Sequence, residues 1–185
     1  MIIFSSIIST LQGLNQICIR KILTYSSINH TSWMISALMN SFNTWVYYFT
    51  FYCLSNFNII MIFKNYNTFF MNQLNTIFSF NMKLKFIFML NFLSLGGLPP
   101  FIGFLPKWLT INNLVNNNNF TLITMLIIFS LISLYFYLRM AFSSFSMFYN
   151  QYLIIPLKKI NYLIILLNLI ILMSLITCNF LTNFF

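Results

Sequence analysis

Long apolar stretches separated by short polar or basic breaks run along the whole chain, and this pattern predicts membrane-spanning helices. A transmembrane helix needs about 20 predominantly apolar residues, and most of the apolar stretches approach or exceed that length. We therefore predict an all-α integral membrane protein with about six transmembrane helices in a single domain, 1–185. The expected segments, of which the first is partial or short, are 1–14, 22–39, 42–63, 84–115, 120–142 and 161–185.

The segment 84–115 is too long for one straight crossing of a membrane. About 32 helical residues would extend about 48 Å, whereas the hydrocarbon core is about 30 Å thick. Glycine breaks helices through its backbone freedom and proline through its missing N–H. We predict that the helix breaks between Gly96 and Pro106. The residues expected to make the break are Gly96, Gly97, Pro99, Pro100 and Pro106.

The composition excludes most other protein classes and several kinds of chemistry. The chain is 60% hydrophobic and only 5% charged, which a soluble domain of this length could not match. It has a net charge of +9 and no Asp or Glu, so acid–base carboxylate pairs and two-metal sites are excluded. Cys18, Cys53 and Cys178 lie far apart and show no ligand spacing, so we expect no metal site and interpret them as small buried apolar residues.

The basic residues follow a pattern that fits the predicted crossings. If the chain crosses the membrane six times, all basic residues except Lys107 lie at or nearest to one side of the membrane. The positive-inside rule assigns that side to the cytoplasm or matrix. The opposite ends, at 40–43 and 116–119, carry no basic residue. The basic residues of the first side are Arg20, Lys21, Lys64, Lys83, Lys85, Arg139, Lys158 and Lys159.

Lys107 is the leading candidate for a functional residue, because it lies beside the predicted break. Burial disfavours the charged form of a lysine, so such a side chain can load and release a proton. Broken helices next to ionisable groups are also how transporters build ion sites. The alternative is that Lys107 extends to the membrane surface near Asn112 and Asn113.

His30 and the pair Arg20–Lys21 are weaker candidates. A single histidine inside a membrane helix is either a proton relay or a polar group satisfied by a neighbouring helix. Arg20 and Lys21 are either markers of membrane topology or a possible charge relay. The sequence leaves both alternatives open.

Two further groups have ordinary explanations. The Ser26 and Ser27 hydroxyls either form a hydrogen-bond chain or bond back to their own helix. The aromatic residues at 44–52 and 135–137 are interpreted as packing and as part of the interfacial belt, with no cofactor-binding role.

Three stretches carry a family resemblance that covers residues 14 to about 150. They are 14–30 (LNQICIRKILTYSSINH), 91–108 (NFLSLGGLPPFIGFLPKW) and 135–139 (YFYLR). They resemble NADH dehydrogenase subunit 2 of mitochondrial respiratory complex I, in its C-terminal part and in arthropod-like versions. The resemblance implies an antiporter-like fold, with the second inverted repeat followed by a final helix. It also places Lys107 at the proton-channel lysine of the second broken helix and His30 on the central hydrophilic axis.

The resemblance implies a core membrane-arm subunit of the proton-pumping NADH:ubiquinone oxidoreductase, in the mitochondrial inner membrane. Such a subunit contributes to proton translocation, contacts other membrane-arm subunits and lipid, and binds no nucleic acid. No redox catalysis is expected within this chain, because NADH, FMN, the Fe–S clusters and ubiquinone bind to other subunits. The alternatives are a self-contained cation/proton antiporter and a truncated structural remnant. The chain also departs from the family, because the N-terminal half with the first broken helix is not found in it.

Overall fold

The computed structural model describes residues 1–66, 68–71, 73, 82–99 and 101–145. The predicted segment 161–185 and the basic residues Lys158 and Lys159 lie outside these described residues, as does Pro100. All the secondary-structure elements of the described residues are helices, apart from one isolated β-bridge between Cys18 and Phe70.

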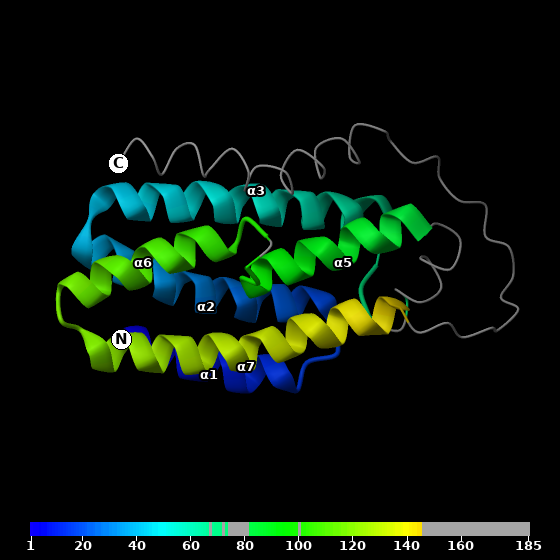
Figure 1. Ribbon diagram of the computed structural model, residues 1–185. Helices are drawn as coiled ribbons and strands as arrows, with labels where there is room; N and C mark the ends of the chain where they lie inside the picture. The colour runs from blue at the N-terminus through cyan, green and yellow to red at the C-terminus, as the bar shows by residue number, and fades with distance from the viewer. Residues whose placement is uncertain (67, 72, 74–81, 100, 146–185) are drawn as a thin grey trace, which may run out of the picture.

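The helices form an elongated bundle in which neighbours run along a common direction (Figure 1). Helix α2 is central, because it packs against α1, α3, α6 and α7. Helices α5 and α6 lie end to end between α3 and α7, with the break between them in the middle of the bundle (Figure 1). The bounds are α1 Ile2–Leu14, α2 Ile19–Asn40, α3 Phe42–Tyr66, α5 Met82–Gly96, α6 Phe104–Asn116 and α7 Phe120–Phe145.

Two of the described helices are long and apolar enough to cross a membrane unaided. They are the stretches Phe42–Asn65 in α3 and Phe120–Ser143 in α7. Helix α5 has 15 residues and α6 has 13, so each extends only about 20 Å at about 1.5 Å per residue. Neither reaches across a core of about 30 Å, whereas the two end to end do.

Helix α2 is long enough for a crossing, with 22 residues, but its buried face is polar. It buries Ser26, Asn29 and His30 between the apolar residues Ile22 and Trp33. Ile22 belongs to one apolar cluster of the core and Trp33 to a second. The polar centre of the bundle therefore lies between two apolar clusters, on the face of α2 that packs against other helices.

The predicted helix break is confirmed. Helix α5 ends at Gly96, and Gly97 adopts a positive φ of 80°. Helix α6 begins at Phe104, which makes Pro106 its third residue. A proline is tolerated in the first turn of a helix, because the N–H groups there have no partner within the helix.

The two ends of the bundle differ in chemistry. At one end, Asn117 donates a hydrogen bond of 2.7 Å to Asn40, and Asn113 donates one of 3.0 Å to Ser41. These bonds join the α2–α3 turn to the α6–α7 turn. The opposite end carries the basic side chains described for this part of the chain, apart from Lys107. They are Arg20 and Lys21 at the start of α2, Lys64 at the end of α3 and Arg139 near the end of α7. For these residues the arrangement agrees with the expected separation of charge.

Candidate functional site

Lys107 is buried in the middle of the bundle. It is the fourth residue of α6, and only 7% of its surface is exposed. The side chain reaches back across the break, and its Nζ donates a hydrogen bond of 2.9 Å to the carbonyl oxygen of Gly96. The alternative that Lys107 extends to the membrane surface does not fit this geometry, because the ammonium points toward the end of α5.

The Lys107 ammonium is held by neutral groups. Its hydrogen-bond acceptor is the last residue of α5, where helix carbonyls carry a partial negative charge. Nζ also lies 5.9 Å from the ring centroid of Trp33, within the range of a cation–π interaction. The whole chain has no Asp or Glu, so it supplies no carboxylate to this lysine. A lysine bound to a carbonyl can lose its proton without leaving a buried anion beside it.

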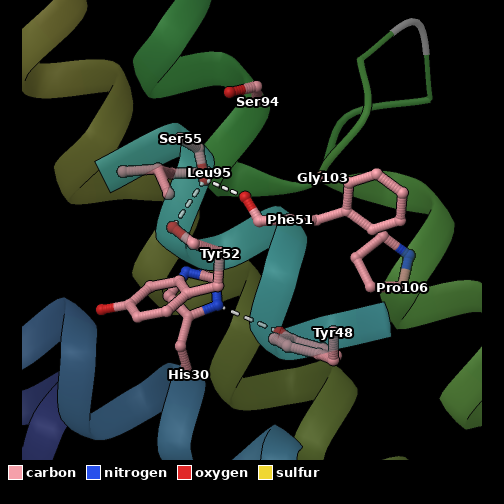
Figure 2. Close-up of a pocket in the computed structure, with 9 residues that line it drawn as sticks. All are labelled: His30, Tyr48, Phe51, Tyr52, Ser55, Ser94, Leu95, Gly103 and Pro106. Atoms are coloured by element: carbon pink, nitrogen blue, oxygen red, sulfur yellow. Dashed lines mark hydrogen bonds between the residues drawn. The ribbon is translucent and has the colours of Figure 1, made fainter. Parts of the chain in front are cut away.

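The break also encloses a small cavity next to Lys107. The cavity has a volume of about 10 Å³, and its lining includes His30, Ser94, Gly103 and Pro106 (Figure 2). That volume is about what one water molecule needs. A Cβ at Gly103 would collide with the Ser94 carbonyl oxygen, so the absence of a side chain there lets the break pass directly over the end of α5.

His30 is enclosed by three tyrosines, two from α3 and one from α7. Its Nδ1 lies 3.0 Å from the Tyr48 hydroxyl and its Nε2 lies 3.5 Å from the Tyr137 hydroxyl. The imidazole ring also faces Tyr52 at a centroid distance of 4.7 Å (Figure 2). A neutral imidazole donates from one nitrogen and accepts at the other, while a phenol can do either. The two hydrogen bonds that link Tyr48, His30 and Tyr137 can therefore both reverse direction.

His30 and Lys107 line the same region of the bundle. His30 and Trp33 are three residues apart on α2, so they share a face. Trp33 lies beside the Lys107 ammonium, and Pro106 lines the same cavity as His30. The structure thus brings together two of the residues that the sequence singled out, along with the glycines of the break.

Arg20 and Lys21 lie apart from this centre. Both side chains are exposed at the start of α2. The guanidinium of Arg20 lies over the ring of Phe69, 4.3 Å from its centroid. Ser26 and Ser27 each donate a hydrogen bond of 2.7 Å to the carbonyl three residues earlier in α2. Their hydroxyls also hydrogen-bond to tyrosines beside His30, Ser26 to Tyr137 and Ser27 to Tyr52.

The interpretation of the cysteines as buried residues was wrong for Cys53, which is exposed on α3. Cys18 is half-buried, and Cys178 lies outside the described residues. Cys53 occupies a helix that is only partly covered by the bundle, and an apolar thiol is compatible with a lipid-facing position. No group of three or more His, Cys, Asp or Glu side chains capable of holding a metal ion occurs in the described part of the chain.

Two parts of the site were not foreseen from the sequence. One is the role of Tyr48 and Tyr137 as partners of His30. The sequence does indicate that Tyr48 and Tyr52 share a helix face, because they are four residues apart. The other is Arg139, whose guanidinium donates hydrogen bonds of 2.6 Å to Leu14 and 2.9 Å to Gln16, at carbonyls just beyond or at the end of α1. Both depend on contacts between helices that are distant in sequence.

Comparison with known families places this geometry in context. Residues 1–133 match the family described as "NADH:quinone oxidoreductase/Mrp antiporter, TM". A protein of Anopheles albimanus called NADH-ubiquinone oxidoreductase chain 2 is 47% identical over 131 residues, which cover 71% of this chain and 77% of that relative. A relative of the same name from Locusta migratoria is 42% identical over 173 residues, 94% of this chain and 51% of its own length.

The chain spans about half the length of some of these relatives. The Anopheles gambiae protein of the same name is 47% identical over 81% of this chain, but only 44% of the relative is covered. Among solved structures, a chain of respiratory complex I from Thermus thermophilus with bound aureothin superimposes with a TM-score of 0.81. That match covers 94% of this chain and 42% of the other, at 21% identity, and it shows a shared fold.

Proposed function

The chain belongs to the NADH:quinone oxidoreductase/Mrp antiporter membrane family, on the branch of NADH-ubiquinone oxidoreductase chain 2, and from this premise we propose a function. The proposed function is that of a membrane-arm subunit of the proton-pumping NADH:ubiquinone oxidoreductase, complex I. The subunit contributes to proton translocation, which is coupled to electron transfer from NADH to ubiquinone on other subunits. The family and the names of the relatives support this assignment. The proposed chemistry is argued from the residues at the centre of the bundle.

The observation that carries the proposal is the buried Lys107 ammonium at a helix break. Ionisable residues inside a membrane are costly and are by default functional. Here the ammonium is bound to the Gly96 carbonyl, and this chain has no Asp or Glu side chain to pair with it. With a carbonyl as its hydrogen-bond acceptor, the ammonium can exchange its proton without leaving an anion at that acceptor. We assign Lys107 the role of proton-loading site.

The remaining polar groups of the centre suggest how a proton reaches that site. His30 bridges two tyrosine hydroxyls from different helices and lines the cavity beside Pro106. We assign His30 the role of a relay between Lys107 and neighbouring parts of the membrane arm. Arg20 and Lys21, at the basic end of the bundle, are proposed as a charge relay toward the aqueous phase on that side.

The setting of the subunit follows from the same family. The proposed location is the mitochondrial inner membrane, with several crossings, and the proposed partners are other membrane-arm subunits and lipid. The chain itself is proposed to bind no redox cofactor, so NADH, FMN, the Fe–S clusters and ubiquinone would act elsewhere in the complex.

Proton translocation by vesicles that contain complex I with Lys107→Ala tests the proposal. We expect assembly and electron input to persist, while the number of protons moved per NADH falls and coupled quinone reduction slows. Wild-type translocation by assembled Lys107→Ala complex would contradict the role of Lys107. A self-contained antiporter, the rival from another class, would instead exchange cations for protons when the chain alone is placed in liposomes.

A further inference from the structure

A glycine with an unusual backbone conformation follows the last residue of α5. Gly97 has a φ of 80°, in the left-handed region that favours glycine. Its N–H donates to the Ser94 carbonyl at 3.0 Å, and the N–H of Leu98 donates to the Leu93 carbonyl at 3.4 Å. This pair of bonds, with a left-handed residue just beyond the helix, is the Schellman motif.

The two bonds of the motif do not involve the carbonyl of Gly96, the last residue of α5. The last carbonyls of a helix have no partner within it. The two bonds of the motif satisfy Leu93 and Ser94, and Lys107 donates to Gly96. The left-handed turn at Gly97 carries the chain away from the helix axis directly after Gly96. The ammonium therefore adds a hydrogen bond to the C-terminal cap of α5 from the far side of the break.

The missing side chain of Gly97 matters as much as its conformation. A Cβ at this position would lie 2.9 Å from both Cδ and Nζ of Lys107, and 3.1 Å from Cε. Distances below 3.0 Å essentially never occur for a real Cβ, so the end of the Lys107 side chain must shift when a methyl group is added at residue 97. The bound lysine lies directly against the position that a side chain at residue 97 would take.

We propose that Gly97 is the positioning residue for Lys107: its left-handed conformation ends α5 with the Gly96 carbonyl facing the ammonium, and its missing side chain makes room for the lysine. This deepens the proposed function and rests on it, because it explains how a buried lysine is held in a chain with no acidic residue. Within this chain, the C-terminus of α5 is the acceptor for the ammonium, through one charge-assisted hydrogen bond and its partial negative charge.

Gly97→Ala is the direct perturbation. The added methyl group should move the Lys107 ammonium out of hydrogen-bonding distance of the Gly96 oxygen. Losing a hydrogen bond to a charged group shifts an equilibrium by roughly tenfold to a hundredfold, so the bound position should become a minor one. Translocation of protons per NADH should fall severalfold in the assembled complex.

A matched control separates this effect from backbone strain. Asn118 also has a positive φ, of 58°, in the α6–α7 turn, and its side chain is exposed. Asn118→Ala therefore places alanine in a left-handed conformation far from Lys107. We expect assembly and translocation close to wild type for Asn118→Ala, and a loss of translocation for Gly97→Ala.

The experiment combines a structure with a double-mutant cycle in the assembled complex. An electron cryomicroscopy structure of the Gly97→Ala complex should show the Nζ–O hydrogen bond broken; an intact bond would overturn the proposal, whatever Lys107→Ala does to pumping. In the cycle, Gly97→Ala should cause no further loss of translocation when added to Lys107→Ala, since the methyl group then has no lysine to displace. Additive losses would show that Gly97 acts on the fold alone. Wild-type pumping by Lys107→Ala would instead refute the proposed function, and the structure would still decide the positioning.

Discussion

Lys107 and Arg139 each cap the end of a helix with a basic side chain, but they do so in two different regions of the bundle. Arg139 is half-buried at the basic end and donates to two carbonyls at the end of α1, those of Leu14 and Gln16. Lys107 is buried in the centre and donates to one carbonyl, that of Gly96. In a chain without acidic residues, helix C-termini serve as the acceptors for buried and half-buried cations.

The difference between the two caps lies in what the cation can do. A guanidinium stays protonated in proteins and offers a planar fork that matches two acceptors. An amine can lose its proton, and a single carbonyl holds it by one bond. Under the proposed function, the same interaction gives a permanent structural clamp at the end of the bundle and a site for proton exchange at its centre.

The largest effect on stability is expected at the structural clamp. Arg139→Ala leaves the carbonyls of Leu14 and Gln16 without their donor and should weaken the packing of α1 on α7. Hydrogen bonds to charged groups contribute about 1.5–3 kcal/mol, and we expect a total loss of that order because the side chain is half-buried. The temperature at which the complex dissociates on native gels should fall, while protons moved per NADH by intact complex stay unchanged.

Lys64→Ala is the matched control for this prediction. It removes one positive charge from the same end of the bundle, at an exposed position in the last turn of α3. Dissociation temperatures that fall equally for Lys64→Ala and Arg139→Ala would assign the effect to net charge. They would contradict the role of Arg139 as a helix cap.

The next effect concerns the histidine beside Lys107. His30→Leu removes the partner of the buried Tyr48 hydroxyl, and an unsatisfied buried polar group costs about 1–3 kcal/mol. His30→Gln keeps a group that can hydrogen-bond but cannot relay a proton as imidazole does. We therefore expect weaker assembly for His30→Leu, and normal assembly with lower proton translocation for His30→Gln. Wild-type translocation by His30→Gln would reduce His30 to a structural hydrogen-bonding group.

The smallest effect is expected at the end opposite the basic residues. Asn117→Ala removes a hydrogen bond to Asn40 between two exposed turns. Surface substitutions of this kind usually change the free energy of unfolding by less than about 0.5 kcal/mol. Both the dissociation temperature and the translocation of protons should match the wild type. A clear loss of translocation would mean that proton exchange depends on the ends of the bundle as well as its centre.

The helix break was predictable because its cause is local. Prolines cannot donate backbone hydrogen bonds, and Pro99 lies two residues after Gly97, which adopts a conformation that favours glycine. Lys107 was singled out because it lies beside the predicted break, and the sequence left open whether it is buried or extends to the membrane surface. These conclusions depend on residues that are close in sequence.

The partners of the candidate site were not predictable in the same way. The Gly96 carbonyl carries no sequence signal as an acceptor, because its availability depends on how α5 ends. Tyr48 and Tyr137 reach His30 from two other helices, and the rotation of each helix about its axis is set by packing in three dimensions. The exposure of Cys53 likewise follows from which face of α3 the bundle covers.

The reciprocal exchange of the two cations tests the central claim most directly. Protons moved per NADH are measured in vesicles for assembled complex carrying Lys107→Arg and for complex carrying Arg139→Lys. Lys107→Arg keeps the charge but removes the ability to release a proton, so translocation should be lost although the complex forms. Arg139→Lys should lower the dissociation temperature and leave translocation per complex at the wild-type value. Full translocation by Lys107→Arg would contradict the account, because a permanent cation at the break would then serve as well as a lysine.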